Sequence, residues 1–153
     1  MSITHKREED HTSTTETNLS RQKCVLLIGS TNDTMLLVQS ALQEYGQADY
    51  RLEFAEHMSE GLNRIQNDRV DIVLLDIDSP ESSGPERYVW IRVTAPRLPI
   101  LILIGDWGDS TERALATLGA NDFLMKDLLS GPELINSIRT ALSRKKQTNR
   151  KWW

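Results

Sequence analysis

Cysteine, histidine and long apolar runs are all scarce in this chain of 153 residues. The single cysteine, Cys24, excludes an internal disulfide and a metal site built from several cysteines. Because Cys24 begins an apolar segment, we interpret it as a small buried side chain rather than a reactive thiol. His5 and His11 are too isolated to form a metal site, and His57 falls at the start of a predicted helix. With no nucleophile–base pair or metal cluster visible, an enzyme is not expected.

No apolar stretch approaches the roughly 20 residues that a membrane-spanning helix requires. The N-terminus also lacks the apolar core of a signal peptide, so we expect a cytoplasmic protein without a membrane partner. The formal net charge of -4 gives no electrostatic reason to expect nucleic acid as a partner of the folded part.

Composition divides the chain into three parts. Residues 1–21 contain almost no apolar side chains, which predicts a disordered leader. Residues 22–144 have the apolar content of one globular domain. Residues 145–153 form a basic segment that ends in two tryptophans and is typical of a linker or tail. Because the chain stops soon after its last predicted helix, we expect a fragment whose linker leads into an output domain.

From Cys24 onward, strand signals alternate with amphipathic helix signals. Asn32 is the expected N-cap of the first helix, Gly119 ends the fourth, and Ser130 and Pro132 begin the fifth. This alternation predicts a three-layer α/β fold, a doubly wound, flavodoxin-like parallel sheet with strand order 2-1-3-4-5. The predicted strands are Cys24–Gly29, Tyr50–Ala55, Asp71–Asp76, Ile100–Ile104 and Asp122–Met125.

The segment between the third and fourth strands is ambiguous. Arg87–Val93 is rich in β-branched residues and nearly alternating, which favours a strand. Pro85 before it, and the need for a crossover between two parallel strands, favour a helix. We predict a helix.

The strongest functional candidate is Asp76, which ends an apolar run typical of a buried parallel strand. Ligands bind at the carboxyl ends of the strands in such a sheet. A carboxylate there is costly to bury unless a cation, a hydrogen-bond donor or solvent meets it. The side chains or backbone expected at the same edge belong to Gly29, Ser30, Asp78, Ile104, Gly105 and Lys126.

Two segments resemble the receiver domains of two-component response regulators. Asp71–Pro80 with Gly84 is similar to the family's phosphoacceptor segment, and Leu118–Lys126 is similar to its fifth strand with a lysine. The resemblance extends over about Lys23–Arg144, nearly all of the expected ordered chain.

The resemblance implies a phosphorylation switch. In the family, a histidine kinase transfers a phosphoryl group to the aspartate that matches Asp76, and an acidic pair after the first strand holds Mg²⁺. The lysine that matches Lys126 pairs with the acyl phosphate. A Ser or Thr at the end of the fourth strand then turns inward and repositions an aromatic residue of the fifth.

This sequence departs from the family pattern in several places. Gly29 and Ser30 replace the acidic pair, and neither supplies a carboxylate to Mg²⁺. Ile104 stands at the Ser/Thr position, and Phe123 stands at the aromatic position; neither carries a hydroxyl. Asp127 follows the lysine where proline is usual.

We therefore predict no metal cofactor. Asp33 lies a helical turn beyond the required position, and Asp76 with Asp78 would hold a divalent ion only weakly, through water. The plain interpretation of Asp78 is a loop carboxylate of the Asx-turn type. Lys126 remains as the partner of Asp76, and such a pair stabilises both charged forms. The leading hypothesis is a degenerate receiver, or pseudo-receiver, that acts by binding proteins, with phosphorylation of Asp76 absent or weak.

Three alternatives stay open. The first is a working receiver that a histidine kinase phosphorylates on Asp76. The second is a flavodoxin-like FMN-binding protein, because Gly29–Thr34 resembles a hydroxyl-rich phosphate loop and Trp107 could lie beside a flavin. That hypothesis leaves the motifs of Asp76 and Lys126 unexplained. The third is a small-ligand-binding module in which the vacated pocket accepts an anion beside Lys126.

The expected partners are proteins, either a histidine kinase or an output domain. In the family, the fourth helix, fifth strand and fifth helix form a common dimer or output surface, so a homodimer through this face is an option. Arg113, Asp122, Arg139 and Arg144 could form ion pairs there, although solvated helix faces explain such charges equally well. Trp107, in the loop before this face, is either an interface anchor or a partly buried side chain.

Overall fold

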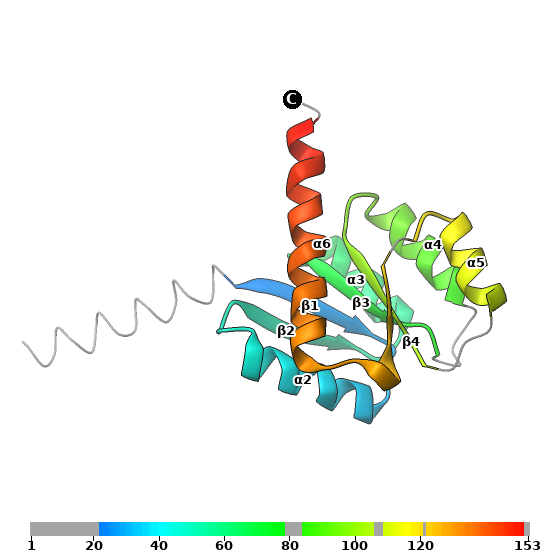
Figure 1. Ribbon diagram of the computed structural model, residues 1–153. Coiled ribbons are helices and arrows are strands. Elements are labelled where there is room, and N and C mark those ends of the chain that lie inside the picture. The colour runs from blue at the N-terminus through cyan, green and yellow to red at the C-terminus, as the bar shows by residue number, and fades with distance from the viewer. Residues whose placement is uncertain (1–21, 79–83, 106–108, 121, 152–153) are drawn as a thin grey trace, which may run out of the picture.

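The computed structural model of the protein describes residues 22–78, 84–105, 109–120 and 122–151. Its centre is one parallel sheet whose strands lie in the order β2-β1-β3-β4-β5 (Figure 1). The predicted topology is therefore confirmed, and strand ends differ from the prediction by about one residue. The strands are β1 (Lys23–Ile28), β2 (Tyr50–Ala55), β3 (Ile72–Asp76), β4 (Ile100–Ile104) and β5 (Phe123–Met125).

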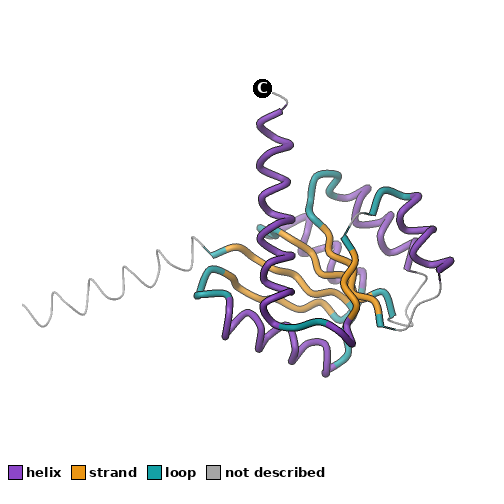
Figure 2. Tube along the Cα trace, viewed as in Figure 1, coloured by secondary structure: helices purple, strands orange, loops and turns teal. Residues whose placement is uncertain are grey.

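Helices cover both faces of this sheet (Figure 2). The α2 and α6 helices pack together on one face, and α4 packs between α3 and α5 on the other. The segment Arg87–Val93 lies inside α4, which confirms the helix predicted there. The elements are α2 (Asn32–Tyr45), α3 (Met58–Asn67), α4 (Gly84–Thr94), α5 (Asp109–Thr117), the short 3₁₀ helix η1 (Lys126–Leu128) and α6 (Gly131–Lys151).

Alternate residues of each central strand enter two separate cores. Leu26 and Ile28 of β1 pack on the side of α3, α4 and α5. Val25 and Leu27 pack on the side of α2 and α6. Because both faces are buried, these strands read as continuous apolar runs rather than as an alternating pattern. Cys24, at the edge of this region, is buried as predicted, and burial raises the pKa of its thiol.

The helix ends follow the predicted signals with one correction. The N-cap of α2 is Thr31 rather than Asn32, because Asn32 is already helical and the Thr31 hydroxyl accepts the Thr34 N–H at 3.4 Å. Ser130 caps α6 as predicted, accepting the Glu133 N–H at 3.2 Å. Gly119 follows α5 with a φ of 101°, in the left-handed region that suits glycine.

The α6 helix is longer than predicted. It continues past Arg144 to Lys151 and extends beyond the sheet in Figure 1. Lysine, arginine and glutamine are good helix formers, so this basic segment prolongs the helix instead of leaving it. No helix in the described part of the chain is long and apolar enough to cross a membrane. The predicted leader, residues 1–21, lies outside the described residues, as do Trp152 and Trp153.

Candidate functional site

Asp76 is the last residue of β3 and lies at the carboxyl edge of the sheet, between β1 and β4. Its side chain is only 1% exposed. Asp76 thus lies at the edge where the sequence places it, and its burial means that it needs nearby donors, because burial penalises its charge.

Lys126 supplies the main partner. It begins η1 directly after β5, and its Nζ lies 3.0 Å from Oδ1 and 3.1 Å from Oδ2 of Asp76. The same Nζ lies 2.8 Å from Oδ2 of Asp78. The predicted pair of Lys126 with Asp76 is therefore present, and Asp78 joins it.

The pKa of Lys126 reflects two opposing effects. Burial lowers it, but the hydrogen bonds and charges of Asp78 and Asp76 outweigh burial, so the pKa lies above the ordinary lysine value. The ammonium group therefore stays charged at neutral pH. One cation is shared between two carboxylates.

This raised pKa makes the stability contributed by Lys126 sensitive to alkaline pH. The contribution is fully present below the ordinary lysine pKa of about 10.4 and is lost as pH rises through the higher folded value. We expect the free energy of unfolding of the wild type to exceed that of Lys126→Met by a constant amount up to about pH 9 and by less above about pH 10. Urea denaturation across this range measures the difference. A difference that stays constant throughout would contradict the prediction.

Asp78 links three strands of the sheet. Its backbone N–H donates to Oδ1 of Asp76 at 3.0 Å, and its own Oδ2 accepts the backbone N–H of Gly105 at 2.6 Å. Asp76 thus makes a local Asx-type bond, and Oδ2 of Asp78 reaches across to Gly105 after β4 and to Lys126. The Asx turn predicted for Asp78 itself involves the residues up to Pro80, which lie outside the described residues.

Gly105, directly after β4, leaves the space that Asp78 uses. A Cβ atom at this position would lie 2.7 Å from Oδ2 of Asp78 and 3.2 Å from Cε of Lys126. A larger residue would push the carboxylate off the backbone amide. The glycine therefore leaves room for the close contact in the form that the structure contains.

Arg87 belongs to the site although sequence reasoning did not select it. It lies in α4 with a fully buried side chain. Its Nη1 donates to the carbonyl of Asp76 at 2.7 Å and its Nη2 to the carbonyl of Ile77 at 2.6 Å. A signal did exist: Arg87 shares a helical face with the buried residues Gly84 and Ile91. An arginine on the buried face of a helix indicates that a specific hydrogen-bond acceptor lies in the core beside it.

The remaining predicted residues do not join the network that the described residues form around Asp76. Gly29 has a φ of 67° and donates its N–H to the carbonyl of Ala55 at 2.9 Å. The Ser30 hydroxyl donates to the carbonyl of Thr31 at 3.1 Å. Ile104 is buried in the core on the α4 side, and Phe123 packs half-buried against that core.

The side chains at this edge do not fit Mg²⁺. The ion requires several oxygen ligands in near-octahedral geometry. Both oxygens of Asp76 accept from Lys126, and Oδ2 of Asp78 accepts from Gly105 as well. Across residues 22–78, 84–105, 109–120 and 122–151, no group of three or more His, Cys, Asp or Glu side chains is placed to hold a metal ion. We therefore derive no chemistry through a metal here.

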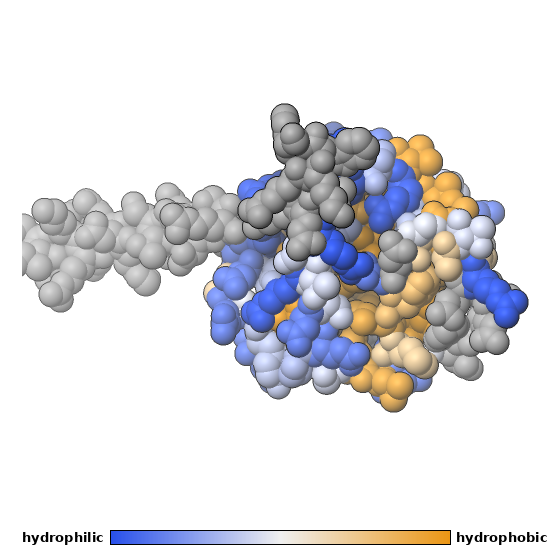
Figure 3. Space-filling view, turned by 45° about the horizontal axis from the view of Figure 1, so that its top comes forward, coloured by the Kyte–Doolittle hydropathy of each residue, from blue (hydrophilic) through white to orange (hydrophobic). Residues whose placement is uncertain are grey.

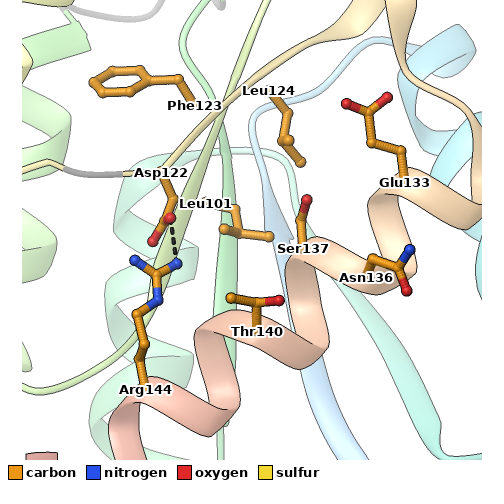
Figure 4. Close-up of a pocket in the computed structure, with 9 residues that line it drawn as sticks. All are labelled: Leu101, Asp122, Phe123, Leu124, Glu133, Asn136, Ser137, Thr140 and Arg144. Carbon is orange, nitrogen blue, oxygen red and sulfur yellow. Dashed lines mark hydrogen bonds and ion pairs between the residues drawn. The ribbon is translucent and has the colours of Figure 1, made fainter.

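A separate groove of about 500 Å³ lies between β5 and α6 (Figure 4). Asp122 and Arg144 form an ion pair at one end of it, and Glu133 lies on the α6 side. Two of the four charges nominated for a partner surface are thus paired with each other. The groove residues Leu101 and Leu124 belong to the core on the α6 face, so the groove is distinct from the Asp76 network.

A five-stranded parallel sheet of order 2-1-3-4-5 with flanking helices is the CheY-like, flavodoxin-like α/β fold. In this chain an aspartate at the end of β3 pairs with a lysine after β5. Residues 25–139 match the response regulator receiver domain family, and the chain belongs to that family. Receiver domains work in two-component systems with histidine kinases and output domains, and they are in general signalling modules rather than enzymes.

Individual relatives agree with this assignment. A probable transcriptional regulatory protein of Picosynechococcus sp. is 30% identical over 139 residues, 86% of this chain and 53% of that protein. Response regulator MprA of Mycolicibacterium vanbaalenii is 37% identical over 97 residues, 62% of this chain and 41% of that protein. This chain thus spans about half the length, or less, of these curated relatives. The crystal structure of a CheY-like receiver domain protein from Methanospirillum hungatei has a TM-score of 0.70 at 22% identity, covering 83% of this chain and 98% of that one.

Proposed function

We propose that this protein is a pseudo-receiver, a regulatory module that signals by binding other proteins, with phosphorylation of Asp76 absent or weak. The observation that carries the proposal is the closed network around Asp76. Lys126 engages both carboxylate oxygens, and the Asp78 N–H engages Oδ1 as well. An oxygen that attacks a phosphoryl group has to give up the hydrogen bonds it accepts, and the two oxygens of Asp76 accept three, two of them from one charged ammonium group.

The charge of the pocket also opposes phosphoryl transfer. Catalysis of this reaction depends on positioned cations that offset the negative charge of the transferred group. Lys126 is already shared by Asp76 and Asp78, and Gly29 and Ser30 add no carboxylate to recruit a metal. The buried Ile104 has no hydroxyl to bind a phosphoryl oxygen and start a switch. These features support a module without a resident cofactor.

The proposed partners are proteins in the cytoplasm, either a histidine kinase or an output domain. We propose that they bind the face formed by the fourth helix, the fifth strand and the fifth helix, and a homodimer through this face is the alternative. In the structure this face consists of α5, β5 and α6. Figure 3 shows hydrophobic surface gathered on the right of the view, the side where α4 and α5 lie in Figure 1, and hydrophilic surface on the left. Among the described residues, the large exposed apolar side chains are Leu36, Tyr45, Trp90, Val93, Leu118, Met125 and Leu128.

Incubation of the protein with acetyl phosphate and Mg²⁺ tests the proposal. We expect no mass gain of one phosphoryl group at Asp76, and beryllofluoride with Mg²⁺ should leave the amide NMR signals of Asp76 and Gly105 in place. A receiver domain that retains the acidic pair, treated in parallel, verifies the reagents, and Asp76→Asn shows any reaction elsewhere. Stoichiometric modification that disappears in Asp76→Asn would establish the alternative of a working receiver.

The structure gives no support to flavin binding. The Thr31 hydroxyl caps α2, and this role explains the hydroxyl-rich segment Gly29–Thr34 without a phosphate ligand. Trp107, the aromatic residue nominated to lie beside a flavin, falls outside the described residues. A purified protein without the yellow colour of a flavin is the expected result.

A further inference from the structure

We propose that Asp78 is a built-in anion, which fills an oxyanion-binding site formed by Nζ of Lys126 and the backbone N–H of Gly105. The inference deepens the proposed function, since it explains how the pocket stays closed without a phosphoryl group. The ligand class of the site is a tetrahedral oxyanion such as phosphate. In the wild-type protein the carboxylate of Asp78 takes its place.

The geometry of the donors comes first. One oxygen of Asp78, Oδ2, lies 2.8 Å from Nζ of Lys126 and 2.6 Å from the amide nitrogen of Gly105. The two donors come from different strands, after β5 and after β4, and they converge beside the carboxylate of Asp76. A charged ammonium and a backbone N–H aimed at one oxygen are the usual elements of an oxyanion site.

The space around Gly105 supports the same conclusion. A Cβ atom at Gly105 would lie 2.7 Å from Oδ2 of Asp78, so the absence of a side chain there lets an anionic oxygen lie in this position beside the amide. The site is therefore shaped around an oxygen atom. Asp78 itself is 33% exposed, so its side chain fills the mouth of the site from the solvent side and is not part of the core.

The charges at the edge decide what else can enter. Asp76 and Asp78 carry two negative charges, and Lys126 and the buried Arg87 carry two positive charges, so these four groups sum to zero. A phosphate ion would have to approach within about 4 Å of the Asp78 carboxylate, where the two like charges repel each other. Removal of the Asp78 carboxylate takes one negative charge from these four groups, frees the Gly105 N–H and leaves Lys126 with Asp76 as its carboxylate partner.

Substitution of Asp78 should therefore create a phosphate-binding site. We expect Asp78→Ala to bind inorganic phosphate at least about tenfold more tightly than the wild type does. The amide NMR signal of Gly105 reports the event directly, because it loses its bond to Asp78 in the variant and regains an acceptor on titration with phosphate. Lys126→Met in the Asp78→Ala background removes the ammonium and should abolish the saturable shift.

Asp33→Ala is the matched control. Asp33 is exposed in the first turn of α2, so its removal deletes the same charge without touching Lys126 or Gly105. This variant should respond to phosphate as the wild type does. If Asp33→Ala gains the same affinity as Asp78→Ala, the effect is one of net charge and the proposal is overturned.

Asp78→Asn keeps an acceptor for the Gly105 N–H but loses the charge paired with Lys126. Its phosphate affinity should fall between those of the wild type and Asp78→Ala, and it provides the same comparison if Asp78→Ala does not fold. A saturable Gly105 shift in the wild type, or its absence in both Asp78 variants, would overturn the inference. Phosphorylation of wild-type Asp76 by acetyl phosphate would instead overturn the proposed function, so the two failures are distinguishable.

Discussion

Replacement of Lys126 by methionine is expected to destabilise the protein by about 3–5 kcal/mol at neutral pH. Methionine keeps much of the apolar stem but removes the ammonium group. Asp76, only 1% exposed, would then lose the cation that contacts both of its oxygens. Breaking a buried ion pair on one side costs more than the pair contributes, because the remaining charge is left uncompensated.

Urea denaturation followed by circular dichroism measures this loss. Lys23→Met, at the half-buried start of β1, is the matched control and should change the free energy of unfolding by about 0.5 kcal/mol or less. The double variant Asp76→Asn/Lys126→Met should recover most of the stability, because it removes both charges. A loss below about 1 kcal/mol in Lys126→Met would mean that solvent or another donor satisfies Asp76.

Asp76 and Lys126 could be predicted from the sequence because Asp76 ends one strand of a recognisable pattern and Lys126 directly follows another. The carboxyl ends of parallel strands meet at one edge, so topology alone brings the two side chains together. The topology was itself readable from the alternation of strand and helix signals, and the crossover rule correctly identified α4.

The role of Asp78 could not be predicted in the same way. An aspartate shortly before Pro80 favours a turn, and this local preference carries no information about the neighbouring strand β4. The contact with Gly105 depends on the register of β3 against β4, in which Asp76 pairs with Leu103. It also depends on the missing side chain at position 105. Both conditions arise only in the folded sheet.

Other differences have equally physical causes. Residues 145–151 lack a periodic apolar pattern, so the sequence predicts a linker there. The α6 helix nevertheless continues to Lys151, because lysine, arginine and glutamine have high intrinsic helix propensity. Arg87 was read only as part of a helix. Its burial follows from the way α4 docks against the end of β3, which no single-segment pattern contains.

Arg87 therefore provides the second large prediction, a loss of about 3–5 kcal/mol for Arg87→Ala. The guanidinium holds the carbonyls of Asp76 and Ile77, and its removal leaves two strand-end acceptors buried without these donors. Truncation of a fully buried side chain of this size also leaves a cavity. Chemical denaturation gives the stability, and hydrogen exchange at Asp78 shows whether the end of β3 has loosened.

Arg87→Met separates the loss of the guanidinium hydrogen bonds from the loss of side-chain volume, and Arg92→Ala is its control. Arg87→Met fills most of the cavity without donating to either carbonyl, so it should remain less stable than the wild type by about 2 kcal/mol. Arg92→Ala is the matched control on the same helix, because Arg92 is half-buried and donates to the Tyr88 hydroxyl and the Leu98 carbonyl nearer the surface. Its loss should be about 1 kcal/mol. If Arg87→Met were as stable as the wild type, packing alone would explain the buried arginine. If it is less stable, as we expect, the guanidinium is what holds Asp76 and its loop in the geometry that Lys126 and Asp78 require.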